Sequence, residues 1–149
     1  MKQLKFIVLL FVLLMLSACP NEHGDAYRFN NNSTVDVYMY FDLDFLGFTL
    51  YPDTAISQVR KGELFKQGKG GTYLTSYKYL FERNDTLSMF IFDAKIFDTY
   101  CWEDIRNDYK ILQRYDISKE NYETLRHSIT YPPTEAMKNI KMYPPYGSE

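Results

Sequence analysis

Leu-Ser-Met-Phe-Ile-Phe, residues 87–92, is the stretch of sequence that decides the fold. Five of its six side chains are apolar, and a continuous apolar run of this length, rich in aromatic residues, is typical of a buried strand. Asn84-Asp85 marks a turn just before the run. Residues 87–92 therefore predict the central strand of a sheet.

Further predicted strands lie on both sides of this run. In residues 35–41 the apolar side chains of Val37, Met39 and Phe41 alternate with Tyr38 and Tyr40, so we expect the tyrosines on the wetter face of that strand. Residues 73–81 fit a strand or a helix, and 61–71 look like a flexible basic loop. Other strands are expected at residues 27–29, 45–51, 56–60, 109–115 and 128–131.

Two short helices are predicted late in the chain. Asp98 can cap the first, in which Trp102, Ile105 and Tyr109 share one face, and Ser118 can cap the second. Strands outnumber helices, and aromatic residues, which favour strands, make up 17% of the chain. The predicted fold is mainly β (α+β), an antiparallel β-sandwich-like domain with two short helices.

Residues 1–18 have the composition of a signal peptide. Lys2 and Lys5 supply the positive start, and residues 6–16 form an unbroken apolar run. That run is shorter than the roughly 20 residues that cross a bilayer as a helix, and polar residues end it at once. The alternative is an anchor helix that stays attached to the protein.

The last residues of this segment, Leu16-Ser17-Ala18-Cys19, resemble the bacterial lipobox. An ordinary cleavage site needs small side chains at −1 and −3, where Leu16 fits poorly. The resemblance implies that Cys19 carries a diacylglycerol thioether that anchors the chain in a bacterial membrane. Residues 19–25 would then be a lipidated tether and 26–149 a single globular domain. Because Pro20 rather than Asp follows the cysteine, we expect the outer membrane or the cell surface.

Several motifs extend the resemblance over most of the mature chain. Tyr-Pro-Asp-Thr at 51–54, Leu-Ser-Met-Phe-Ile-Phe-Asp at 87–93, the helix with Trp102 and Met-Tyr-Pro-Pro-Tyr at 142–146 are similar to segments of small uncharacterised lipoproteins of gut anaerobes. That group implies no activity for this chain. Asp-Thr-apolar sequences at Thr54 and Thr86 also resemble sites of O-glycosylation in exported proteins of such bacteria.

Composition narrows the possible partners. Without Lys2 and Lys5 the mature chain has 15 basic and 19 acidic side chains, a net charge of −4, which argues against binding to nucleic acid. Lipid on Cys19 would leave Cys101 without an intramolecular partner, as a buried thiol or in a mixed or intermolecular disulfide. Without lipidation, a bridge between Cys19 and Cys101 becomes possible.

No catalytic, metal or cofactor motif is found in the sequence. His23 and His127 lack the spacing of metal ligands, and the glycines near Lys69 lack the hydroxyl of a phosphate loop. A small hydrolase would require Cys101 to meet His127, or two acids to converge. The acids in question are Asp93, Asp98, Glu103, Asp104 and Asp108.

The tyrosines carry the expected function. Tyr38, Tyr40, Tyr77 and Tyr79 are candidates for an exposed binding surface, since aromatic faces anchor protein interfaces and stack on sugars. The alternative is that they only fill sheet edges. We expect a lipid-anchored, non-catalytic protein-interaction module of the cell envelope without a cofactor. Its partners would be the membrane, through lipid on Cys19, and envelope proteins. The alternative is a glycan-binding accessory lipoprotein, and a small hydrolase comes third.

Lipidation can be tested by palmitate labelling of the full chain in a bacterial host. The native chain should incorporate labelled palmitate, and Cys19→Ser should not, because the acceptor thiol is gone. Equal labelling of the native chain and Cys19→Ser would show that the anchor assignment is wrong.

Overall fold

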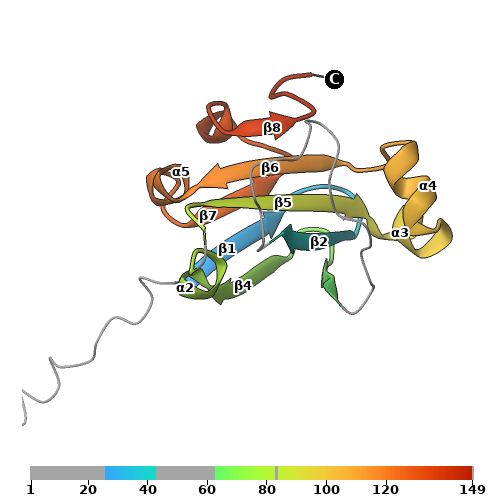
Figure 1. Ribbon diagram of the computed structural model, residues 1–149, viewed down its shortest axis with the longest axis horizontal. Coiled ribbons are helices and arrows are strands. Elements are labelled where there is room, and N and C mark those ends of the chain that lie inside the picture. The colour runs from blue at the N-terminus through green and yellow to red at the C-terminus, as the bar shows by residue number, and fades with distance from the viewer. Residues whose placement is uncertain (1–25, 43–62, 83, 149) are drawn as a thin grey trace, which may run out of the picture.

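The computed structural model describes residues 26–42, 63–82 and 84–148, which form two β-sheets with short helices (Figure 1). The domain is mainly β, as predicted. The strands expected at 45–51 and 56–60 lie outside the described residues, as do Cys19 and Thr54. Within the described part of the chain, no helix has the length and apolar content needed to cross a bilayer.

The larger sheet has five strands in the order β3-β2-β5-β6-β8. Every neighbouring pair in it is antiparallel. β5 is central, which confirms the prediction from residues 87–92. The strands are β3 (Phe65–Gln67), β2 (Val37–Asp42), β5 (Thr86–Asp93), β6 (Gln113–Ser118) and β8 (Lys141–Tyr143).

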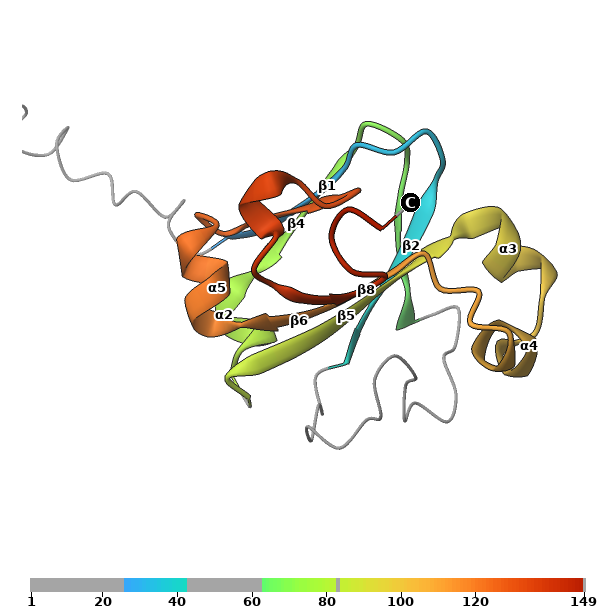
Figure 2. The same ribbon diagram turned by 90° about the horizontal axis from the view of Figure 1, so that it is seen from above.

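The smaller sheet has three strands: β4 (Thr72–Ser76), β1 (Ala26–Asn31) and β7 (Ser128–Tyr131). β1 is antiparallel to β4 but parallel to β7, so this sheet is mixed rather than purely antiparallel. Parallel neighbours cannot be joined by a tight turn, and here β1 and β7 are far apart in the chain. Figure 2 shows β1 and β4 as a layer above β5, β6 and β8.

The helix that directly follows β5, α3 (Ala94–Thr99), was not predicted from the sequence, and Asp93 caps it. Oδ1 of Asp93 accepts hydrogen bonds from the backbone N–H groups of Lys95 at 2.7 Å and Ile96 at 3.2 Å. A capping residue has extended backbone geometry, and Asp93 has it as the last residue of β5.

The helix predicted around Trp102 is α4 (Trp102–Asn107), and its capping position is Cys101, which makes no side-chain cap hydrogen bond. The prediction that Asp98 caps this helix is therefore wrong, since Asp98 lies inside α3.

The second predicted cap is confirmed. Ser118 caps α5 (Lys119–Thr124), and its Oγ accepts a hydrogen bond from the N–H of Asn121 at 3.1 Å. The ambiguous residues 73–81 divide between β4 and α2 (Tyr77–Leu80). Tyr109, expected at the start of a strand, has a positive φ of 47° after α4, and β6 begins four residues later. A short 3-10 helix, η3 (Glu135–Met137), precedes β8.

The main hydrophobic core lies between the two sheets. Tyr27 and Phe29 of β1 and Ile129 of β7 point into it from the smaller sheet and are fully buried. The larger sheet contributes alternate residues of its strands, namely Val37, Met39, Phe41, Leu87, Met89, Ile91, Tyr115, Ile117 and Met142. This alternation is the expected pattern for the inner face of a sandwich.

A second core covers the opposite face of the larger sheet. Phe90 and Phe92 of β5 and Ile105 of α4 are at most 1% exposed there, beneath α3 and α4. Tyr38 belongs to this core and is 6% exposed, so its predicted place on a wet strand face is wrong. Its ring packs on Phe97 of α3, with the ring centroids 5.7 Å apart. Alternation in the sequence shows which residues share a face of the strand, but it does not show that both faces are covered by other elements.

Buried tyrosines make the stability of the fold sensitive to alkali. Burial raises the pKa of Tyr27 and Tyr115 well above the ordinary value near 10. The Tyr27 hydroxyl donates to Sδ of Met89 at 3.0 Å, and the Tyr115 hydroxyl donates to the backbone oxygen of Thr130 at 2.9 Å. Both phenols therefore stay protonated in the folded state at pH values where the unfolded chain ionises.

We therefore expect the free energy of unfolding to fall as the pH rises above about 10. Below that pH the stability that comes from these raised pKa values is fully present. Above it, each phenol lowers the free energy of unfolding by about 1.4 kcal/mol per pH unit, because only the unfolded chain ionises. Urea unfolding between pH 8 and 11 measures the slope. Tyr115→Phe should flatten the slope, and Tyr79→Phe at an exposed position should not. Equal slopes for the two variants would contradict the assignment.

Candidate functional site

The clearest candidate site is a pocket at one side of the sandwich, which we call the aromatic pocket. It has a volume of about 300 Å³, at the lower end of the range for small-molecule sites. Both sheets and α2 contribute to its wall. The lining residues are Tyr40, Phe41, Asp42, Glu63, Phe65, Tyr73, Thr75, Tyr79 and Leu80.

Strand alternation places three aromatic rings, which we call the basal rings, together in the wall of this pocket. Phe41 of β2 points between the sheets, and Phe65 of β3, which lies opposite Met39, shares that face. Tyr73 of β4 lies opposite Phe29 and points inward from the smaller sheet. β3 and β4 each have a single strand neighbour among the described residues, so these rings lie at the sheet edges.

The three rings contact one another without being coplanar. Ring centroids are 5.0 Å apart for Phe65 and Tyr73, 5.7 Å for Phe41 and Phe65, and 6.3 Å for Phe41 and Tyr73. Their planes are tilted by 45°, 55° and 30° respectively. These angles lie between the stacked and the edge-to-face arrangements that aromatic pairs favour. The cluster continues the core up to the surface, where Phe65 is 39% exposed.

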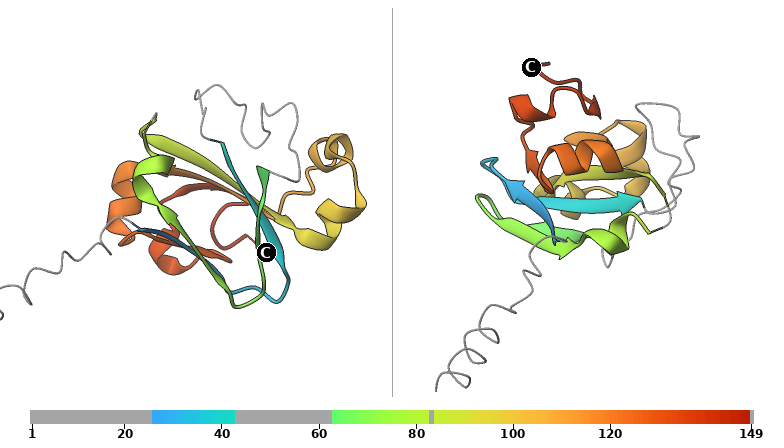
Figure 3. Two further views of the ribbon diagram at one scale, coloured as in Figure 1. Left: turned by 90° about the horizontal axis from the view of Figure 1, so that it is seen from below. Right: turned by 90° about the vertical axis from the view of Figure 1, so that its left-hand side faces the viewer.

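The rim of the aromatic pocket carries more polar groups. Tyr79 comes from α2 and is 60% exposed. Figure 3 shows α2 directly after β4. Asp42 ends β2, and Glu63 is the first described residue before β3. These two carboxylates are the charged groups among the described lining residues, and both have interactions within the protein. The described wall of the pocket is therefore aromatic and acidic.

The structure divides the predicted tyrosine surface. Tyr40 and Tyr79 line the same pocket, although they lie far apart in sequence. Tyr38 is buried beneath α3, where its hydroxyl donates to Oδ1 of Asp98 at 3.4 Å. The side chain of Tyr77 lies outside the described positions. The predicted set of four therefore does not form one exposed surface.

Sequence reasoning missed two of the three basal rings. Phe65 fell in residues 61–71, which were expected to be a loop, whereas residues 65–67 form β3. Tyr73 fell in the segment assigned to neither strand nor helix. Residues 72–75 carry no clear alternation of apolar and polar side chains, because the apolar Leu74 points outward and is 58% exposed.

Four of the five acids considered for hydrolysis have structural partners. Asp93 caps α3, and Asp98 accepts the Tyr38 hydrogen bond. Asp104 accepts a hydrogen bond from Sγ of Cys101 at 3.2 Å, and Asp108 pairs with Nζ of Lys110 at 2.7 Å. In the described residues no group of potential metal ligands comes together.

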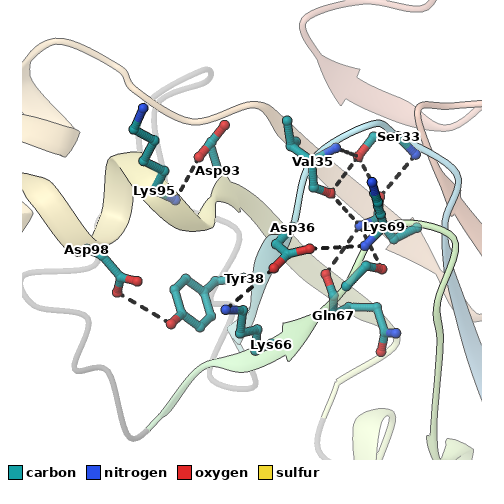
Figure 4. Close-up of polar contacts among 12 residues, drawn as sticks. Ser33, Val35, Asp36, Tyr38, Lys66, Gln67, Lys69, Asp93, Lys95 and Asp98 are labelled. Atoms are coloured by element: carbon teal, nitrogen blue, oxygen red, sulfur yellow. Dashed lines mark hydrogen bonds and ion pairs between the residues drawn. The ribbon is translucent and has the colours of Figure 1, made fainter.

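A second hollow, between β2 and α3, contains charges of both signs (Figure 4). Oδ2 of Asp36 lies 3.5 Å from Nζ of Lys66, and Oδ1 accepts a hydrogen bond from the backbone N–H of Lys69 at 3.2 Å. Both side chains of the ion pair are about half exposed, so the pair contributes at most about 1 kcal/mol. These contacts fix the start of β2 and do not assemble a reactive group.

Cys101 and His127 lie at opposite ends of the domain, so the proposed nucleophile pair does not form. Cys101 is exposed at the start of α4, and His127 follows α5 (Figure 1). The His127 ring instead stacks on Tyr122, with the ring centroids 5.0 Å apart. The expectation that Cys101 is a buried thiol is also wrong.

A buried polar cluster lies on the outer face of the larger sheet. Arg114 is fully buried, and its Nε donates to Oδ1 of Asp116 at 2.8 Å. Oγ of Ser88 donates to the same oxygen at 2.6 Å, and the Arg114 guanidinium lies over the Phe90 ring, 5.4 Å from its centroid. Ser88 and Asp116 are direct cross-strand neighbours. The cluster thus ties β5 to β6, and its serine has a carboxylate partner.

Removing the guanidinium of this ion pair should strongly destabilise the fold. Arg114→Met leaves the Asp116 carboxylate buried without its guanidinium, which should lower the free energy of unfolding by about 3–5 kcal/mol in urea denaturation. Lys141→Met is the control, since Lys141 also lies 3.4 Å from Asp116 but its side chain is 62% exposed, and it should cost less than about 1 kcal/mol. Similar losses for the two variants would refute this role of Arg114.

Of the two predicted glycosylation sites, Thr86 is described and begins β5, half-buried.

Comparison of the chain with known protein families, with curated proteins and with solved structures found no match.

Proposed function

We propose that the protein is a lipid-anchored, non-catalytic binding module of the bacterial cell envelope that contacts partner proteins through the aromatic pocket. The aromatic pocket itself carries this proposal. It presents the rings of Phe65 and Tyr79 to solvent at a hollow that joins both sheets. Aromatic side chains that fill or line such hollows are frequent anchors of protein interfaces.

The strands beside the pocket suit the same role. β3 and β4 are edge strands among the described residues, and an edge strand offers backbone groups to an added extended segment. Leu74 on the outer face of β4 adds exposed apolar surface next to these backbone groups. A partner segment along this edge could place one side chain in the aromatic pocket.

The position of the expected anchor fits a site close to the membrane. Ala26, the first residue of β1, lies opposite Ser76, which directly precedes α2 with its pocket residue Tyr79. Seven residues of tether from Cys19 to residue 25 span at most about 25 Å when fully extended. Lipid on Cys19 would therefore hold the aromatic pocket near the membrane surface, where other envelope proteins are concentrated.

A glycan-binding accessory lipoprotein is the second candidate. The observation that favours it is the combination of the tyrosine rings of Tyr40 and Tyr79 with the carboxylates of Asp42 and Glu63 in one pocket. Rings can stack on sugar faces, and carboxylates can accept hydrogen bonds from hydroxyl groups. The tilt of the basal rings argues against a flat stacking platform.

Site-specific photo-cross-linking tests the proposed function in intact cells. Tyr79→p-benzoylphenylalanine should give a discrete adduct with an envelope protein, because position 79 lies at the rim of the pocket. Tyr146→p-benzoylphenylalanine, an exposed tyrosine in the C-terminal segment, is the matched control and should give no such adduct. The proposal fails if position 79 gives no adduct or only those also formed at position 146.

A further inference from the structure

We infer that the aromatic pocket selects a positively charged side chain, and that its occupant is a lysine of the partner protein. This inference rests on the proposed function, since it names the group that the pocket takes. It depends on the chemistry of the pocket wall, which combines aromatic faces with carboxylates.

The charge of the described wall favours a cation. Asp42 and Glu63 line the pocket, and no basic side chain does so among its described lining residues. Lys66 of the adjacent strand β3 points to the other face, where it pairs with Asp36 and lies over the Tyr38 ring. Asp42 and Glu63 have other interactions, but a carboxylate can accept several hydrogen bonds and so can receive a further N–H donor.

The aromatic part of the wall suits the rest of a lysine side chain. A lysine has an apolar stem of four methylene groups, which can pack on the basal rings of Phe41, Phe65 and Tyr73. A lysine that lies across the pocket can pack this stem on the rings and bring its ammonium group to the Tyr79 ring and to the carboxylates, which accept hydrogen bonds. Cations are attracted to tyrosine and phenylalanine faces within about 6 Å. The wall thus offers apolar rings for the stem of a lysine, and carboxylates beside a tyrosine ring for its charged end.

The experiment compares two peptides that differ only in charge. The mature chain with Cys19→Ser is titrated with acetyl-Gly-Thr-Lys-Thr-Gly-amide and with the same peptide carrying norleucine in place of lysine, and binding is followed by NMR of the aromatic rings. We expect the lysine peptide to bind about tenfold more tightly at low salt. The preference should shrink in 0.5 M sodium chloride, because salt screens the attraction between exposed charges.

Variants that remove one carboxylate test whether the preference for the lysine peptide arises in the aromatic pocket. Glu63→Gln and Asp42→Asn should each reduce the lysine preference severalfold and leave the affinity for the norleucine peptide nearly unchanged. Glu63 is exposed, so its variant remains informative if Asp42→Asn, next to Ser88 in the sheet, fails to fold. Glu120→Gln on α5, an exposed acid outside the pocket, is the control and should retain the preference.

The possible outcomes separate the inference from the proposed function. Equal binding of the two peptides in the pocket overturns the lysine assignment and leaves the binding function standing. Binding of neutral methyl glycosides, with no response to the lysine peptide, overturns the assignment and favours the glycan candidate. No response to any of these probes overturns the lysine assignment, and if Tyr79 also forms no cross-link the proposed function fails too.

Discussion

The burial of β5 on both faces is the constraint on which the rest of this structure depends. Leu87, Met89 and Ile91 face the smaller sheet and are fully buried, while Phe90 and Phe92 on the other face are at most 1% exposed. Each such side chain contributes about 1.5–3 kcal/mol when removed from water. A strand of this kind must be covered twice, so the domain needs both a second sheet and the α3–α4 pair.

The outer face of the larger sheet is covered differently along its length. Near α3 and α4 the contacts are apolar, around Phe92 and Ile105. Farther along β5 and β6 they are polar, around Ser88, Arg114 and Asp116. Desolvation cancels much of the attraction in a buried ion pair, so the apolar contacts carry most of the stability. The polar cluster has another consequence, because a shift of β6 by one residue would turn Arg114 and Asp116 into the main core.

The parts of the fold that could be predicted depend on neighbouring residues. The run at 87–92 identified the central strand, and Ser118 identified the start of α5, because a cap is a contact over three residues. The errors occur where distant segments decide. Tyr38 has the sequence position of a residue on the solvent-facing side of its strand, and it is buried only because α3 packs over it. Asp98 does not cap the helix with Trp102, because it already lies inside α3, which begins where β5 ends at Asp93.

The same dependence on distant segments explains why only part of the candidate site could be predicted from the sequence. Tyr40 and Tyr79 could be selected by residue type, but Phe65 and Tyr73 matter only because edges of two different sheets meet. The cluster formed by Phe41, Phe65 and Tyr73 also holds the short strand β3 against β2. A ligand that covers these rings extends the hydrophobic core at the point where it reaches solvent. Binding at the aromatic pocket and the stability of this edge of the sandwich are therefore thermodynamically linked, because a ligand that binds only the folded state stabilises it.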